Sequence, residues 1–434
     1  MSIGHQMAAS CDTTILWANA YEEKKGAPVW EQALVTLWFL ATYIPIPLES
    51  PIRYMLCMFF LVLFMIHKAD AIPVLFKAWP LLLVPALGMI SILWSPMPSA
   101  AFRTAILYIL SVLIVVVMVT RMDARTILRC LMFAGMIAVV ISAPYYSLMY
   151  WGGPYLGAKN YFAQQMLFAG LLSLMAILNE RELPWVRLLA VPFFFIAMLF
   201  MIRGDSATAL IYGVVGCAGL LFIRLFWIEA AGIRHLRMLL VLAMSALLLT
   251  VVMYVLNQSF NNYVNELLGM LGKDRTFTGR TMIWKAGEAE AAKHPMFGVG
   301  LEGFWQDWKG AAQSINEHDY KPYGTKLTFH NAYLEVQVHL GYVGMALYIF
   351  MLAWAGYRLV AQWLRNSSIE TSALLVFGGI VFISTFTESY AWGLFNTPVN
   401  LLYIGALADF SPIRKKFMGR VPVQIGPNNR LLRV

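Results

Sequence analysis

Three polar clusters interrupt the long apolar blocks of this chain, and they contain the side chains that could do chemistry. They are Gly157-Ala158-Lys159-Asn160-Tyr161, Arg203-Gly204-Asp205-Ser206, and a pair of segments, Thr278-Gly279-Arg280-Thr281 and Phe329-His330-Asn331-Ala332-Tyr333-Leu334-Glu335. The planar guanidinium of arginine grips phosphate oxygens in a bidentate manner and stays charged near lipid. A histidine, whose unperturbed pKa is about 6.5, can accept a proton near neutrality. These residue types could therefore bind a phosphorylated group and accept a proton beside it.

Arg203 and Arg280 lie on the side of the membrane that we expect to be extracytoplasmic. The positive-inside rule disfavours basic residues there, so each arginine needs an explanation. One explanation is an anionic partner at headgroup depth, and the other is a snorkelling side chain or a phospholipid anchor. The sequence leaves both open. It also leaves open whether His330 is a proton acceptor or a structural histidine at the level of the headgroups.

Glu335 and Glu388 fall inside or at the end of apolar blocks. Ionisable side chains are costly in such positions and usually face the protein interior. We expect both carboxylates to pair with the arginines as structural partners rather than to act directly.

The composition indicates which elements must position these clusters. The chain has 434 residues, of which 60% are hydrophobic, 14% aromatic and 13% charged, whereas soluble domains have roughly 45–50% apolar and about 25% charged residues. A water-soluble enzyme and a disordered chain are both excluded, and one polytopic membrane domain is indicated. The net charge of +9 comes from basic residues at the ends of apolar blocks, which is typical of membrane topology and argues against a nucleic-acid partner.

A transmembrane helix needs about 20 mostly apolar residues. Twelve spans are predicted, which makes the fold class an all-α, polytopic integral membrane protein. They are 32–48, 54–67, 78–95, 104–120, 127–149, 162–179, 185–202, 206–226, 236–256, 332–357, 370–388 and 395–410.

The basic residues of the short connections predict the orientation. Those on one side are Lys68, Lys77, Arg121, Arg125, Arg129, Arg181, Arg187, Arg224, Arg234, Arg237, Arg358 and Arg365, and those on the other are only Arg53, Arg103, Lys159 and Arg203. Both termini are therefore expected in the cytoplasm, with the chain in a bacterial inner membrane. The expected organisation is a tail at 1–31, spans one to nine at 32–256, a periplasmic loop at 257–331, spans ten to twelve at 332–410 and a basic tail at 411–434.

The long loop at 257–331 is expected to form an ordered extracytoplasmic cap, because it is rich in aromatic and apolar residues. A short helix is predicted from Thr281 to Lys293, ended by Pro295. The stretch Gly298–Gly303 fits the pattern G-x-G-x-x-G, but without a preceding strand it indicates tight turns rather than a dinucleotide site. No cofactor is expected.

Several motifs resemble those of the O-antigen ligase and polymerase superfamily. They are Gly279-Arg280-Thr281-x-x-Trp284, Pro295-x-x-Gly298-x-Gly300-x-x-x-Phe304 and His330-Asn331-x-Tyr333-Leu334-Glu335 with Gly341-x-x-Gly344, preceded by Lys159-Asn160 and Arg203-x-x-Ser206. The resemblance covers most of the chain and is densest over about 200–345. Among the branches of the superfamily, the Gly303-Phe304-Trp305 stretch is most similar to exopolysaccharide polymerases.

The resemblance implies a metal-independent glycosyltransferase whose donor is a glycan on undecaprenyl diphosphate. Arg203 and Arg280 match the positions that bind the diphosphate, with Arg280 also counted as catalytic, and His330 matches the proposed base. Supporting positions are Lys159, Asn160, Asn331, Tyr333 and Glu335. Asp205 departs from the family pattern, which often has a small or hydroxyl residue at that place. A carboxylate there could pair with Arg203 and compete with its phosphate role.

Elementary chemistry agrees with this interpretation. A diphosphate leaving group needs its charge stabilised by a metal or by basic side chains, and no Asp/Glu cluster at metal-ligand spacing is visible in the outer segments. The expected partners are the lipid-linked glycan, a glycan acceptor, membrane lipids, and export or chain-length proteins. Trp284, Trp305 and Tyr333 could stack on sugar rings. The alternatives are an O-antigen ligase that transfers glycan to lipid A core, a flippase for lipid-linked glycan, and a non-catalytic scaffold.

Overall fold

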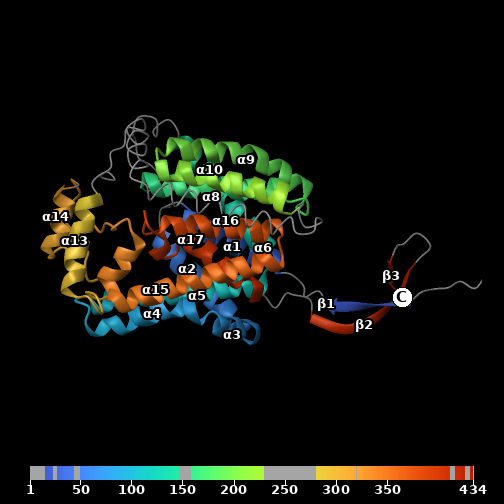
Figure 1. Cartoon of the computed structure of the whole chain (residues 1–434), viewed down its shortest axis with the longest axis horizontal. Coiled ribbons are helices and arrows are strands. Elements are labelled where there is room, and N and C mark those ends of the chain that lie inside the picture. Colours follow the sequence, from blue (N-terminus) through green and yellow to red (C-terminus); the bar gives the residue numbers. More distant parts are fainter. Residues whose placement is uncertain are drawn as a thin grey trace, which may run out of the picture.

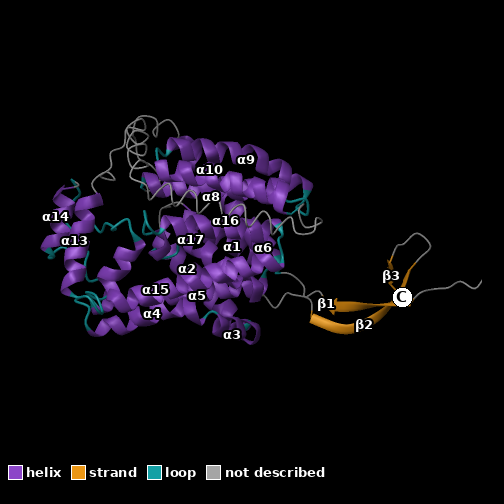
Figure 2. Ribbon diagram, viewed as in Figure 1, coloured by secondary structure: helices purple, strands orange, loops and turns teal. Residues whose placement is uncertain are grey.

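The computed structural model describes residues 15–22, 27–43, 49–145, 158–228, 280–318, 320–410, 416–425 and 431–433. The body is helical, as Figure 2 shows. The α-helices are α1 (Val29–Tyr43), α2 (Glu49–Ile66), α3 (Lys68–Lys77), α4 (Trp79–Ile90), α5 (Pro98–Arg121), α6 (Ala124–Ser142), α8 (Lys159–Leu178), α9 (Pro184–Arg203), α10 (Ala207–Phe222), α13 (Arg280–Lys293), α14 (Gly310–His318), α15 (Ala332–Arg365), α16 (Ile369–Ser384) and α17 (Thr397–Leu407). Short 3₁₀ turns lie at Ser91–Leu93, Ala143–Tyr145, Tyr390–Trp392 and Ala408–Phe410, and a π-helical turn at Ile223–Trp227 follows α10.

Six helices in the described ranges are long and apolar enough to cross a membrane, or seven if the pair α2 and α3, bent by 104°, is one span. The six are Pro98–Arg121, Ala124–Tyr145, Lys159–Leu178, Pro184–Arg203, Ala207–Trp227 and Ala332–Arg365. The predicted all-α polytopic architecture is confirmed. The predicted span 236–256 lies outside the described residues, so the number of twelve spans stays a prediction.

The predicted boundaries shift where local signals were weak. The first helix begins at Val29 rather than at residue 32, and the second predicted span is the first arm of the bent pair α2 and α3. Lys159 and Asn160 lie in the first turn of α8, although we predicted them in the preceding connection.

Helix α8 is the most buried of the candidate membrane spans in the described ranges. It packs against α6, α9, α10 and α16, and its residues are buried on every side. A helix that is apolar all round is typical of an element surrounded by others. A Cβ at Gly135 of α6 would lie 2.9 Å from the Ala169 side chain, and one at Gly204 would lie 2.6 Å from Ala163. These small residues let neighbouring backbones approach α8 closely.

Ion pairs bring together the helix ends that we expect on the cytoplasmic side. Arg121 at the end of α5 pairs with Glu31 of α1 at 2.9 Å, and Arg125 of α6 pairs with Glu370 of α16 at 2.9 Å. Further pairs are Arg129 with Glu182, Arg224 with Glu180, Arg358 with Asp409 at 3.4 Å and Arg365 with Asp409 at 3.0 Å. The predicted inner segments therefore share one face of the body. That this face is cytoplasmic stays a prediction.

The two ends of the chain form a small antiparallel sheet. Strand β1 (Ile15–Glu22) pairs with β2 (Lys416–Ile425), and β2 pairs with β3 (Leu431–Arg433). Figure 1 shows this sheet at the end of the helical body opposite α13 and α14. We name the two ends the terminal face and the cap face. The sequence predicted plain tails at 1–31 and 411–434, because β1 and β2, which form the longer pairing, lie about four hundred residues apart in the chain.

A break in α15 joins the membrane body to the cap, which we define as the described residues from 280 to 331. Gly341 has φ 64° and ψ −163°, a conformation in which the helical hydrogen bonds cannot continue. The freed groups pair with the cap: Tyr342 N–H donates to the Pro295 carbonyl at 2.8 Å, and Gly300 N–H donates to the His339 carbonyl at 2.9 Å. Backbone N–H and C=O groups at membrane depth must all have hydrogen-bond partners. The cap supplies these partners at the break in α15.

The glycines of the G-x-G-x-x-G stretch serve this junction. Gly298 has φ +67°, and a Cβ there would lie 2.4 Å from the carbonyl carbon of His339. Leu301 is held on both sides, since its N–H donates to Ser91 Oγ at 3.1 Å and its carbonyl accepts from Ser95 Oγ at 2.9 Å. The tight turns let the cap backbone lie directly against α15 and the turn after α4.

Candidate active site

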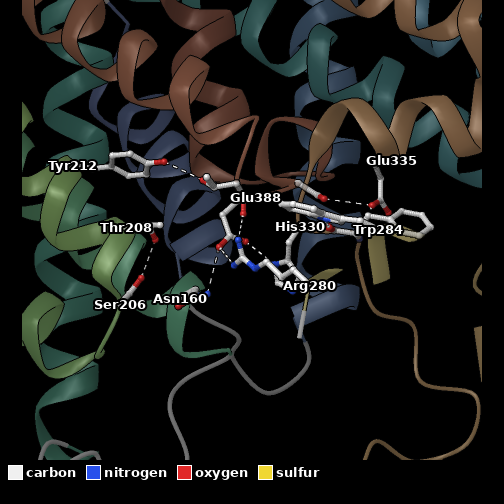
Figure 3. A network of polar contacts seen from close by, with 12 residues as sticks. Asn160, Ser206, Thr208, Tyr212, Arg280, Trp284, His330, Glu335 and Glu388 are labelled. Carbon is white, nitrogen blue, oxygen red and sulfur yellow. Dashed lines mark hydrogen bonds and ion pairs between the residues drawn. The ribbon is translucent and has the colours of Figure 1, made fainter. Parts of the chain in front are cut away.

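Glu388 is the centre of a polar network on the cap face. The residue lies four positions beyond the end of α16, and its side chain is only 2% exposed. Its Oε1 accepts from Arg280 Nη2 at 2.7 Å and from Asn160 Nδ2 at 3.3 Å, while its Oε2 lies 2.7 Å from His330 Nδ1. Figure 3 shows the three partners converging on this carboxylate from separate parts of the chain. Two of the predicted polar clusters thus meet at one side chain.

Backbone contacts hold the segments that carry these residues. Asn331 caps α15, and its side chain accepts from the N–H groups of Tyr333 at 3.0 Å and Leu334 at 3.2 Å. The next residue, Ala332, donates its N–H to the carbonyl of Thr385 at 2.9 Å. The start of α15 is therefore fixed to the end of α16, which places His330 beside Glu388.

Arg280 is the first residue of α13, and its side chain is 11% exposed. Besides the contact to Glu388, its Nη1 donates to the carbonyl of Thr387. A guanidinium has five N–H donors, so these two contacts leave it able to bind an anion as well. Tyr212 of α10 contacts the same residue, with its hydroxyl 3.0 Å from Thr387 Oγ1.

His330 is held in an uncommon backbone conformation, with φ 50°. Non-glycine residues rarely adopt this region, and such strain persists only where the surroundings enforce it. The backbone of the preceding residue is held on both sides: Phe329 N–H donates to Glu335 Oε2, and Trp284 Nε1 donates to the Phe329 carbonyl, each at 2.8 Å. The imidazole side chain is 35% exposed, so its ring lies between the buried Glu388 and the outside of the protein.

The predicted supporting residues have distinct roles. Glu335 is buried, holds the Phe329 amide and accepts from Ser389 Oγ at 3.3 Å. Tyr333 packs against Phe386 with ring centroids 5.0 Å apart, and its hydroxyl accepts from Thr385 Oγ1 at 3.2 Å. The side chains of both residues therefore contact the protein segments around His330 and hold them in place.

The second predicted cluster lies beside the first. Asp205, with φ 47°, pairs with Lys159 at 3.2 Å, and both side chains are exposed. Arg203 ends α9 and is half-buried, and Gly204 packs against Ala163 of α8. The segment of Arg203 thus adjoins the first turns of α8, which carry Asn160. Asp205 has Lys159 as an ion-pair partner, and its pairing with Arg203, which the sequence suggested, stays a prediction.

The cap has an aromatic core of its own. Trp305 is buried against Phe304 and Phe329, with ring centroids 4.9 Å and 5.1 Å away. Its packing leaves no face for a sugar ring, in contrast to the stacking role that the sequence suggested. Trp284 is half-buried, and its indole N–H is engaged by Phe329.

Two cap carboxyls lie among lysines. Burial by itself raises the pKa of Glu290, but Lys309 and Lys293 outweigh it and hold the pKa below the ordinary value of 4.5. Burial likewise raises the pKa of Glu302, but the contacts to Lys326, with smaller contributions from His339 and Thr104, outweigh it and hold that pKa below the ordinary value of 4.5. Glu302 also accepts from Thr104 of α5 at 3.0 Å, so this carboxylate links the cap to the membrane body. Within the described ranges, no three His, Cys, Asp or Glu side chains gather closely enough to hold a metal ion.

Sequence reasoning missed the central place of Glu388, and it did not single out Tyr212 or Thr387. An available signal was the carboxylate at the end of an apolar block, where an ionisable group is costly and is often functional. The sequence located that carboxylate and assigned it only a structural pairing.

The fold and the site define a polytopic membrane protein with an arginine, a histidine and a glutamate gathered under a cap. Comparison with known proteins extends this description. Residues 167–349 match the family model described as O-antigen ligase. The chain is also similar to the exopolysaccharide production protein ExoQ of Rhizobium meliloti (strain 1021), with 26% identity over 347 residues that cover 75% of this chain and 76% of the relative.

These two findings confirm the resemblance to the O-antigen ligase and polymerase superfamily that the motifs indicated. The segment that matches the family model runs from α8 into α15 and contains Arg203, Arg280 and His330. Asn160 and Glu388 lie outside it, one on each side. The superfamily is one of membrane enzymes that process glycans.

Proposed function

We propose that this chain is a glycosyltransferase of the bacterial inner membrane that acts at the periplasmic face on an oligosaccharide carried by undecaprenyl diphosphate. We further propose that it polymerises exopolysaccharide repeat units, because its relative is an exopolysaccharide production protein. The observation that carries the proposal is the pairing of Arg280 and His330 through one buried carboxylate on the cap face. An anion-binding group and a proton acceptor are thereby placed together.

The reaction needs both groups at once. A hydroxyl oxygen of the acceptor sugar attacks the anomeric carbon of the donor, and the bond from that carbon to the diphosphate oxygen breaks. The lipid diphosphate leaves with the electron pair, and Arg280 together with Arg203 stabilises its charge. His330 takes the proton of the attacking hydroxyl. In this proposal Lys159, whose exposed side chain pairs with Asp205 two residues after Arg203, adds positive charge near the site.

An O-antigen ligase is the second candidate, because the matching family model carries that description. A ligase would transfer a complete glycan from the lipid to lipid A core. The glycan that accumulates in a strain without the gene separates the two. Single repeat units on lipid indicate a lost polymerase, whereas complete polymer on lipid indicates a lost ligase.

Reconstitution tests the proposal directly. Purified protein in liposomes would receive a synthetic lipid-linked repeat unit, and the products would be separated by length and identified by mass spectrometry. We expect products of two and more repeats, together with released undecaprenyl diphosphate. The absence of any longer glycan, with the lipid-linked substrate recovered intact, would contradict the polymerase assignment.

A further inference from the structure

One carboxylate serves both groups of the proposed reaction. The Oε1 atom of Glu388 binds Arg280 and Asn160, and its Oε2 atom contacts the ring of His330. The two donors on Oε1 fix the rotation of the carboxylate about its own axis. Because the side chain is almost fully buried, Oε2 then has a single direction, which is toward His330.

The contact selects a tautomer of the imidazole. A carboxylate paired with a guanidinium is a hydrogen-bond acceptor, so the Nδ1 atom of His330 must be the donor. In a neutral imidazole with Nδ1 protonated, Nε2 has the free lone pair. The ring is 35% exposed while Glu388 is 2% exposed, so the ring extends from the buried carboxylate toward the outside of the protein.

The backbone conformation of His330 supports the same orientation of the ring. The strained φ of His330 is maintained by the contacts of Glu335 and Trp284 to the backbone of the preceding residue, Phe329. A histidine that only filled space at the headgroup level would not need its ring and its backbone held by separate elements. The arrangement is that expected where one ring nitrogen must be presented in a constant direction.

We propose that Glu388 is a positioning residue that holds His330 in the Nδ1-protonated form and presents Nε2 as the atom that accepts the proton. The same carboxylate holds Arg280, so one side chain sets the relative placement of the proton acceptor and the diphosphate-binding group. This inference rests on the proposed function, and it adds the residue and the nitrogen atom through which the base would act.

A double-mutant cycle tests whether Glu388 acts through His330. The variants are Glu388→Gln, His330→Ala and the double variant, with kcat and KM for the lipid-linked donor measured separately in liposomes. We expect Glu388→Gln alone to lower kcat roughly 10- to 100-fold, as removal of the outer partner of a functional histidine does. On the His330→Ala background the same change should cost less than about twofold, because the amide oxygen of glutamine can still accept from Arg280 and the contact to the ring is already lost. Glu388→Asp, which keeps the charge, should retain more of kcat than Glu388→Gln.

Three outcomes of this cycle would contradict the proposed role of Glu388 or of His330. An equal loss from Glu388→Gln in both backgrounds would overturn the proposal, since Glu388 would then act independently of His330. An unchanged kcat in Glu388→Gln would also overturn it. A wild-type rate in His330→Ala would instead remove the base from the proposed function, and the two failures are therefore distinguishable.

A chemical readout keeps the test independent of turnover. Diethyl pyrocarbonate modifies an unprotonated imidazole nitrogen, and peptide mass spectrometry reports its rate at His330 alone. Loss of the carboxylate should make that nitrogen less nucleophilic, so we expect modification in Glu388→Gln to be slower by about threefold or more. An unchanged rate in a variant with a wild-type melting temperature would show that Glu388 does not act on the ring.

Discussion

The two ends of helix α16 carry the same trio of residues with one difference. Near its start, the buried Glu370 accepts from Arg125 at 2.9 Å and from Asn179, at the end of α8, at 3.0 Å. Beyond its other end, the buried Glu388 accepts from Arg280 and from Asn160, at the start of α8. Each trio ties α16 to α8, one on the terminal face and one on the cap face.

The difference is the histidine. Glu388 has His330 on its second oxygen, in a strained backbone under the cap. The comparison teaches that a buried carboxylate with an arginine and an asparagine is, in this chain, a way to join two membrane helices. The trio on the cap face is a candidate for chemistry because it has, in addition, a partly exposed imidazole, that of His330.

Removing the histidine should have the largest effect. We expect His330→Ala to lower the rate of glycan extension by about 10²- to 10⁴-fold, because a general base contributes that much. The variant should still insert and fold, since the side chain is half-buried and lies at the edge of the cap face. Reconstituted extension, normalised to folded protein from size-exclusion chromatography, measures it. Extension at the wild-type rate would show that His330 gives the cap-face trio no catalytic role that the trio of Glu370 lacks.

The paired arginines provide a matched test. Arg280→Lys and Arg125→Lys each keep the positive charge but lose the planar guanidinium that pairs with the buried glutamate. Both should lose some thermal stability, while only Arg280→Lys should raise KM for the lipid-linked donor, by roughly tenfold. Steady-state kinetics at several donor concentrations would show the split. A comparable rise of KM in Arg125→Lys would mean that the cap face is not the donor site.

Two glycines of α15 test whether the cap is needed. A Cβ at Gly341 would lie 2.3 Å from the backbone of Met296, at a residue with φ +64°, whereas Gly356 has nothing within 4 Å. Gly341→Ala should loosen the cap and lower activity several-fold. Gly356→Ala should be neutral or slightly stabilising, by up to about 1 kcal/mol. Limited proteolysis of the cap gives the comparison, and equal protection of the two variants would contradict the junction described above.

Acid should affect the cap face through Glu290, and this is the smallest expected effect. Because its pKa is lowered in the folded protein, its contribution to stability is present above the ordinary value of 4.5 and is lost as the pH falls through the folded value. The contribution is modest, since Lys293 is well exposed to solvent. Melting temperatures of wild type and Glu290→Gln across the acid range should converge at low pH. A constant difference between them would contradict the assignment.

Much of the membrane architecture could be predicted from local sequence. The apolar blocks that became α5, α6, α8, α9 and α10 have the length that a bilayer imposes, and Pro295 with the glycines after it ended α13 as predicted. The break at Gly341 could not be predicted in the same way. It is stabilised by hydrogen bonds to Pro295 and Met296, which lie more than forty residues earlier in the chain.

The candidate site, too, could be predicted only in part from the sequence. Arg280 and His330 could be singled out because their side chains are chemically suited to a diphosphate and a proton. The place of Glu388 depends on the packing of α8, α13, α15 and α16. The spacing of residues 160, 280, 330 and 388 in the sequence does not predict that they meet. The sheet of the chain ends is another such case, since β1 and β2 come from opposite ends of the sequence.

Glu388→Gln and Glu370→Gln, compared side by side, test most directly the claim that only the cap-face trio performs chemistry. Both changes are nearly isosteric, and both remove the charge from a buried carboxylate that binds one arginine and one asparagine. Glycan extension per folded molecule should fall roughly 10- to 100-fold in Glu388→Gln and stay within about twofold of wild type in Glu370→Gln. Equal losses in the two variants, or a larger loss in Glu370→Gln, would contradict the claim.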